Sequence, residues 1–168
     1  MLIREAQPAD ADEVAGVHVR SWQVGYRGLL PDVYLDELRP ADRAKAYTFG
    51  TRNPDTPTTI VAEEHGLILG FATTSPSRDP DRPASGELCA LYVDPSCWGT
   101  GVGRALIAEA RARLSDRHFP DAVLWVLQGN ERAARFYRGD GWIADGTRRE
   151  VELWGIVVNE DRYRRSLP

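Results

Sequence analysis

The sequence has 168 residues, of which 42% are hydrophobic and 27% are charged. This size fits a single domain over residues 1–168, and the hydrophobic fraction excludes a chain that is disordered throughout. The formal net charge of −4 argues against a general nucleic-acid or anionic-membrane binder, because such proteins carry a basic excess. The longest apolar runs are only strand-sized and the first residues contain no apolar signal core, so we expect a cytoplasmic protein.

Residues suited to metal or covalent lysine chemistry are scarce. Cys89 and Cys97 lack the spacing of metal ligands, and the three histidines lie far apart in the sequence. We therefore expect no bound metal. Lys45 is the single lysine, which leaves one candidate for a Schiff base.

The first half of the chain predicts a strand, helices and a hairpin. Residues 2–6 are typical of a strand, and Asp10 with Glu13 forms a capping-box pattern at the start of a helix that runs to about Trp22. Further elements are expected as short helices at residues 31–38 and 41–49 and strands at 58–63 and 67–74. Residues 75–86 contain three prolines and predict a mobile loop.

The second half alternates between the two kinds of element. We expect a strand at residues 87–93, a helix ending near 117, a strand at 121–127, a helix at 130–138 capped by Asn130, and strands at 142–153 and 156–164. This order indicates a mixed α/β domain. It has too few β-α-β repeats for a doubly wound sheet.

A glycine-rich segment, residues 98–104, joins a predicted strand to a predicted helix. Its uncovered backbone N–H groups and the positive end of the helix dipole favour a phosphate or pyrophosphate. The segment lacks the last glycine of a dinucleotide fingerprint, because Arg104 follows Gly103, and it lacks the Gly-Lys pair of a P-loop. A plain glycine-rich connector is the alternative.

Trp98-x-x-Gly101-x-Gly103 resembles the pyrophosphate loop of the GNAT superfamily of acyl-CoA-dependent N-acyltransferases. The family pattern has Gln or Arg where this chain has Trp98. Further segments resemble family segments in the same order, namely residues 20–22, 26–28, 87–95 and the N-x-x-A-x-x-F-Y run at 130–137. The resemblance covers nearly the whole chain and implies a splayed mixed sheet of about seven strands flanked by helices.

The resemblance also implies acetyl-CoA as co-substrate. The main chain of Leu91, Tyr92 and Val93 would pair with the pantetheine arm like an added strand, and the Leu91 N–H would polarise the thioester carbonyl. The remaining cofactor-binding positions implied by the family are Trp98, Gly99, Thr100, Gly101, Val102, Gly103, Arg104, Asn130, Ala133 and Phe136. For Asn130, a plain helix cap is the alternative.

Tyr137 and Glu87 are the catalytic candidates. Tyr137 stands where the family places a general acid for the departing thiolate; its alternative is packing beside Phe136. Glu87 matches a carboxylate that serves some members as general base through water, and period-two alternation predicts that it shares a strand face with Cys89 and Leu91. An ordinary strand-edge carboxylate is its alternative.

Trp22 and Tyr26 are expected walls of the acceptor pocket, whereas Trp125 is expected in the core. The function implied is transfer of an acetyl group from acetyl-CoA to a primary amine by direct attack in a ternary complex, with a small or amino-acid-like acceptor favoured over protein. Cys89 or Cys97 offers a ping-pong route that lacks a histidine–carboxylate partner nearby. Two competing hypotheses are a non-catalytic CoA-binding sensor or interaction module on the same fold and a protein that binds nucleotide phosphates. A homodimer is expected from the resemblance alone.

Overall fold

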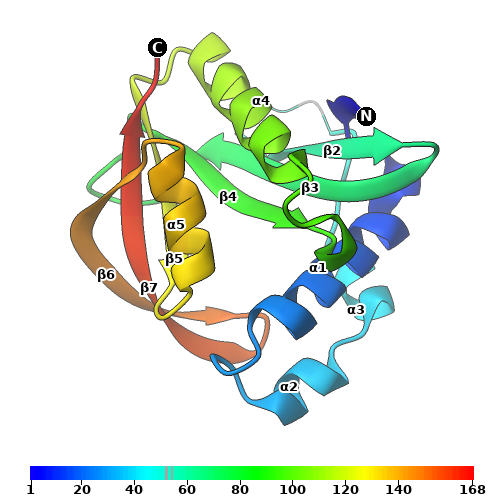
Figure 1. Ribbon diagram of the computed structural model, residues 1–168. Coiled ribbons are helices and arrows are strands. Elements are labelled where there is room, and N and C mark those ends of the chain that lie inside the picture. Colours follow the sequence, from blue (N-terminus) through cyan, green and yellow to red (C-terminus); the bar gives the residue numbers. More distant parts are fainter. Residues whose placement is uncertain (52, 54) are drawn as a thin grey trace.

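The computed structural model describes residues 1–51, 53 and 55–168, and its centre is a seven-stranded sheet with the order β1-β2-β3-β4-β5-β7-β6 (Figure 1). Neighbouring strands are antiparallel except β4 and β5, which run parallel. The strands are β1 (Leu2–Glu5), β2 (Thr58–Glu64), β3 (Leu67–Pro76), β4 (Gly86–Val93), β5 (Asp121–Leu127), β6 (Ile143–Leu153) and β7 (Ile156–Ser166). The expected mixed sheet is confirmed.

Helices cover both faces of this sheet. Successive residues of β2 and β3 point to opposite faces of the sheet. Ile60 and Ala72 belong to the core cluster under α4, whereas Val61 and Phe71 belong to the cluster under α1. Figure 1 shows α4 and α5 on the same side of the sheet. The helices are α1 (Ala11–Gly25), α2 (Asp32–Glu37), α3 (Pro40–Ala44), α4 (Val102–Asp116) and α5 (Glu131–Gly139), with 3-10 turns η1 (Pro8–Asp10) and η2 (Pro95–Cys97).

The sheet opens between β4 and β5. These strands pair only through Gly86 with Ala122 and through Glu87 with Val123, and they diverge toward their carboxyl ends (Figure 1). The pairing of β4 with β3 slips by one residue between Thr73 and Thr74, so Cys89 faces no partner residue. Such a β-bulge bends its strand and increases the local twist. The fork between β4 and β5 is thus built into the strand pairing.

Asp10 stands at the N-cap of α1, as the sequence predicts, but the predicted capping box with Glu13 is not formed. The Asp10 carboxylate instead accepts hydrogen bonds from Arg4 and from the backbone N–H of Gln7, while Glu13 accepts from the N–H of Ile68 at 3.1 Å. The first turn of α1 is therefore tied to neighbouring strands.

The helix expected at residues 41–49 is shorter in the structure, where α3 spans Pro40–Ala44. The prediction of its end is wrong. The chain then turns so that Tyr47 and Phe49 stack on each other, with ring centroids 4.9 Å apart, against the core around Phe71. Burial of these two rings outweighs continuation of a short helix.

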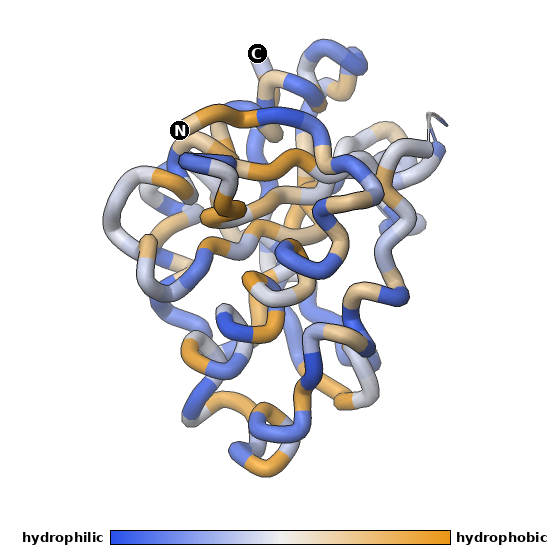
Figure 2. Tube along the Cα trace, turned by 90° about the vertical axis from the view of Figure 1, so that its right-hand side faces the viewer, coloured by the Kyte–Doolittle hydropathy of each residue, from blue (hydrophilic) through white to orange (hydrophobic). Residues whose placement is uncertain are grey.

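The hydrophobic segments run through the central strands, and the hydrophilic segments gather in turns and at the ends of helices (Figure 2). None of the described helices combines the length and the apolar composition that crossing a membrane requires.

Candidate active site

A cavity of about 1050 Å³ passes through the fork between β4 and β5. Its walls come from α1, α3, β4, the start of α4, β5, α5 and the turn between β6 and β7. Every site residue expected from the sequence lines this cavity except Val102, whose side chain is buried in the core under α4. Residues separated by more than 100 positions are therefore brought to one place.

The glycine loop forms one end of the cavity. Gly99 and Gly101 have φ values of +81° and +97°, a region that other residues rarely adopt, and a Cβ atom on either would meet nothing within 4 Å. Gly101 is the N-cap of α4 and supplies no side-chain cap, so the first N–H groups of the helix have no partner within it. The loop therefore presents free donors at a positive helix end, an arrangement that suits an anion.

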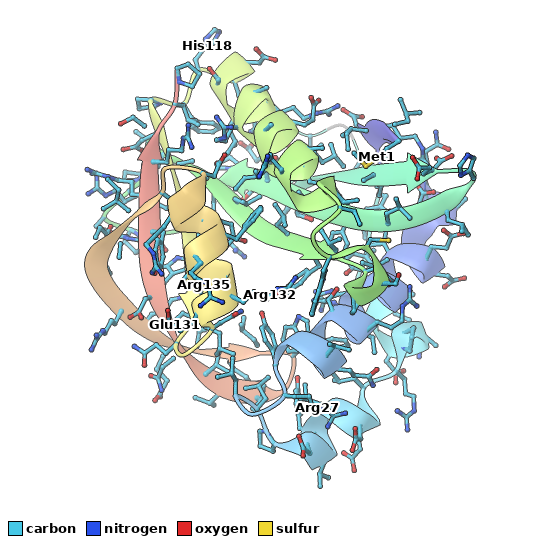
Figure 3. The ribbon with its side chains drawn as sticks, viewed as in Figure 1. Met1, Arg27, His118, Glu131, Arg132 and Arg135 are labelled. Carbon is cyan, nitrogen blue, oxygen red and sulfur yellow. The ribbon has the colours of Figure 1, made fainter. Side chains whose placement is uncertain are left out.

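Trp98 holds this loop in place. Its indole N–H donates to the carbonyl of Val93 at 2.8 Å, and the same carbonyl accepts from the Ser21 hydroxyl at 2.9 Å. The Arg132 guanidinium of α5 lies over the Trp98 ring, 3.2 Å from its centroid. Arg132 and Arg135, drawn on α5 in Figure 3, both line the cavity. Trp98 thus joins the end of β4 to α5 across the opening of the fork.

Helix α5 approaches the loop closely. Asn130 caps α5 by accepting from the N–H of Ala133 at 3.1 Å, as the sequence predicts. The Phe136 ring lies 3.4 Å from the point where a Cβ on Gly103 would sit, an ordinary van der Waals distance, so this side chain of α5 packs directly against the first turn of α4.

Tyr137 reaches the middle of the cavity from α5. Its ring contacts Phe136, with centroids 5.3 Å apart, and Trp142 at 6.3 Å. Burial raises the pKa of the Tyr137 phenol, and the neighbouring Tyr92 raises it further. Among the residues that the structure describes, its hydroxyl has no hydrogen-bond partner. The phenol is therefore kept protonated and is available to donate.

Glu87 does not share a strand face with Leu91 as predicted, whereas Cys89 does lie on its side, with its sulfur 3.1 Å from the hydroxyl of Ser75, the residue opposite Glu87. The bulge at Cys89 shifts the alternation, so that Leu88 and Leu91 both pack in the core under α4. Glu87 instead sits in register with Val123 of β5, whose side chain lies outside that core cluster. A one-residue insertion reverses the face of every residue beyond it, which is why period-two reasoning fails here.

Arg78 occupies both oxygens of Glu87. The Glu87 side chain is only 2% exposed, and its carboxylate accepts from Arg78 Nη2 at 2.7 Å and from Nε at 3.2 Å. The backbone N–H of Arg78 also donates to it at 3.1 Å. The expected general base is thus present in the cavity wall as half of an ion pair.

Residues 75–86, expected as a loop, are tied to the sheet. Ser75 and Pro76 extend β3, and Arg162 of β7, 2% exposed, donates to Asp79 at 3.1 Å and to Asp81 at 2.7 Å. Trp125, expected in the core, instead lines the cavity, with its N–H 3.3 Å from Asp79.

The other end of the cavity is aromatic. Trp22 and Tyr26, the two expected pocket walls, lie with ring centroids 5.0 Å apart, and the hydroxyls of Tyr26 and Tyr92 are 3.4 Å apart. Burial raises the pKa of Tyr26, as do Tyr92 and Tyr137 close by. Three phenols, from Tyr26 just after α1, Tyr92 of β4 and Tyr137 of α5, therefore line this cavity.

Sequence reasoning missed three residues of the aromatic end, namely His18, Arg43 and Trp154. His18 is hidden in the sequence because it occupies the apolar face of α1. Trp154 sits in the β6–β7 turn at φ +48°, and its carbonyl accepts from the Tyr34 hydroxyl at 2.7 Å. The Trp154-Gly155 turn was visible in the sequence, but the element against which it folds was not.

Within the described part of the chain, no group of three or more His, Cys, Asp or Glu residues is placed to hold a metal ion.

Comparisons with known proteins agree with this arrangement. The family model for the acetyltransferase (GNAT) family matches residues 19–142. An uncharacterized N-acetyltransferase of Bacillus subtilis is 32% identical over 131 residues, which cover 77% of this chain and 73% of the relative.

Solved structures share the fold. The ribosomal-protein-alanine N-acetyltransferase from Brucella melitensis has a TM-score of 0.74 at 23% identity, covering 99% of this chain and 100% of that one. The PaiA N-acetyltransferase from Thermoplasma acidophilum, solved in complex with coenzyme A, has a TM-score of 0.70 at 18% identity, covering 96% of this chain and 98% of that one. Together with the family model and the Bacillus relative, these findings show that the chain belongs to the acetyltransferase (GNAT) family and is an acyltransferase.

Proposed function

We propose that this protein transfers an acetyl group from acetyl-CoA to a primary amine by direct attack in a ternary complex. The observation that carries the proposal is a continuous cavity through the β4–β5 fork. It has a glycine loop with free donors at one end, the protonated Tyr137 phenol in the middle and an aromatic pocket at the other end.

The gap between β4 and β5 is suited to binding acetyl-CoA, the acetyl donor. Beyond Glu87 the edge of β4 has no pairing with β5, so the main chain at Leu91, Tyr92 and Val93 is open to an added extended segment such as a pantetheine arm. The carbonyl of Val93 already accepts hydrogen bonds from Ser21 and Trp98, so the pairing uses other main-chain groups of β4, the Leu91 N–H among them. N–H groups at the start of α4 bind the pyrophosphate, as such helix ends do elsewhere.

Different residues around the β4–β5 fork assist different steps of the acetyl transfer. The amine nitrogen forms a bond to the acetyl carbon while the carbon–sulfur bond breaks. The Leu91 N–H donates to the carbonyl oxygen as it gains negative charge, and Tyr137 gives its proton to the leaving sulfur. The proton lost by the amine passes to Glu87 through water, once Arg78 releases one of its oxygens.

Calorimetric titration with acetyl-CoA, followed by a thiol-release assay with a panel of amines, tests the proposal. We expect acetyl-CoA and CoA to bind with a stoichiometry of one, ATP and NAD to bind far more weakly, and thiol release to need an amine. Equal binding of ATP or NAD, or no thiol release with any amine, would contradict it.

A further inference from the structure

Arg43 is a cation in the aromatic end of the cavity, and it has no acidic partner among the residues that the structure describes. It lies on α3, is half-buried and lines the cavity, with its guanidinium 4.9 Å from the ring centroid of Trp154 and 5.3 Å from that of Tyr47. No carboxylate among the described residues lies within ion-pair distance of it. By contrast, Arg78 and Arg149 in the same cavity wall pair with Glu87 and Glu160.

His18 orients the guanidinium. Arg43 Nε lies 3.1 Å from His18 Nδ1, and because a guanidinium carries only donors, this ring nitrogen must accept. The hydroxyl of Tyr47 lies 2.6 Å from the same nitrogen. Burial lowers the pKa of His18, and Arg43 lowers it further, so the imidazole is neutral. The positive charge of this cluster therefore belongs to Arg43 alone, and its guanidinium is engaged within the cluster by the neutral groups of His18 and Tyr47.

The cluster adjoins the place of transfer. The His18 ring stacks on Tyr92 with centroids 4.5 Å apart, and the Tyr92 hydroxyl is 3.4 Å from that of Tyr26. Tyr92, Tyr26 and the proposed acid Tyr137 all line the same cavity as Arg43. One small molecule can therefore span the space from Arg43 to the fork.

We propose that Arg43 binds the carboxylate, or a similarly planar anionic group, of the amine acceptor, so that the acceptor is amino-acid-like. This inference rests on the proposed acetyl transfer. The planar fork of a guanidinium matches a carboxylate, and the Trp154 and Tyr47 rings flank the Arg43 guanidinium at 4.9 and 5.3 Å. An anionic group on the acceptor supplies the counter-charge that the described part of the chain does not.

Matched acceptors test the inference. Glycine, L-alanine, L-leucine and L-phenylalanine are each compared with their primary amides, using acetyl-CoA and a thiol-release readout. The amides have the more easily deprotonated amines, so a preference for the free acids cannot come from amine basicity. We expect kcat/KM to favour the acids by about 30-fold or more, as for a truncated buried charge pair.

Three variants separate the role of Arg43 from a structural one. Arg43→Gln should abolish the preference by raising KM for the acids while leaving the amides and acetyl-CoA binding unchanged, and Arg43→Lys should restore part of it. Lys45→Gln removes the same charge from an exposed position two residues away and should change nothing.

The outcomes distinguish a failure of this inference from a failure of the proposed acetyl transfer. If amides and other neutral amines are acetylated as well as the acids, or Arg43→Gln keeps the preference, the inference is wrong while acetyl transfer stands. If no amine of any kind is acetylated, the proposed function fails and this inference fails with it. Loss of acetyl-CoA binding in Arg43→Gln would show a structural role and would also overturn it.

Discussion

Glu87 and Arg78 form an ion pair whose two members are unequally buried. The Glu87 side chain is 2% exposed and that of Arg78 is 68% exposed, although Nη2 and Oε1 are only 2.7 Å apart. The carboxylate therefore depends on the guanidinium for its counter-charge inside the cavity wall, whereas the guanidinium can be hydrated without the carboxylate. Arg78 thus covers the proposed base and is the member that can move away.

This asymmetry predicts unequal effects on stability. Arg78→Met leaves a buried carboxylate without its main partner and should lower the free energy of unfolding by about 2 to 3 kcal/mol. Glu87→Gln keeps the shape and leaves a hydrated arginine, so its effect should stay below about 1 kcal/mol. Urea unfolding of both variants checks this. Equal losses would show that the pair is not asymmetric in the way that its burial indicates.

Tyr137→Phe should lower kcat by about 100-fold or more, because a positioned acid contributes on that scale. Acetyl-CoA affinity should not change, and Tyr163→Phe, which removes a hydroxyl on β7 outside the cavity, should leave kcat as it is. Since burial raises the pKa of Tyr137, activity should not decline from its ionisation until the pH exceeds the ordinary tyrosine value of about 10. A decline that sets in near pH 8 and is absent from Tyr137→Phe would contradict the assignment.

Cys89 should be an unreactive thiol at neutral pH. Burial raises its pKa to about 11, with the Glu87 carboxylate adding to the shift, and its sulfur lies 3.1 Å from the Ser75 hydroxyl. Only the thiolate is nucleophilic, so alkylation by iodoacetamide in a Cys97→Ala background should be slow at pH 7.5 and should rise about tenfold per pH unit up to pH 11. Fast labelling at pH 7.5 would reopen the ping-pong route through this cysteine.

Gly101→Ala should weaken acetyl-CoA binding. At φ +97° an alanine is strained by about 1 to 2 kcal/mol, and relief of the strain rotates the N–H groups at the start of α4 away from the phosphates. Gly66→Ala is the matched control, because Gly66 also has a positive φ of +79° and open space at its Cβ but lies in the β2–β3 turn. Both variants should lose similar stability, and only Gly101→Ala should lose affinity in calorimetry. Unchanged affinity in Gly101→Ala would remove the loop from the cofactor site.

Local patterns sufficed for much of the fold. The strands around the hairpin at residues 65–66, the cap at Asn130 and the glycine loop before α4 follow from turn residues, capping residues and periodicity close in sequence. Turns and helix caps form between residues close in sequence and need no distant partner, so local sequence patterns predict them. The order of elements and the family resemblance followed from it.

The bulge at Cys89, the pairing of Glu87 with Arg78 and the packing of Trp154 against His18 depend on partners far along the chain. No local pattern marks them, because a bulge is specified by the register with β3, and the β6–β7 turn finds its place only when it packs on α1. The order of the elements, the glycine loop before α4 and the family could thus be predicted from the sequence. The face of Glu87, the guanidinium that covers it and the unpaired Arg43 were decided by tertiary packing, since burial and ion pairing are properties of the space that distant segments enclose.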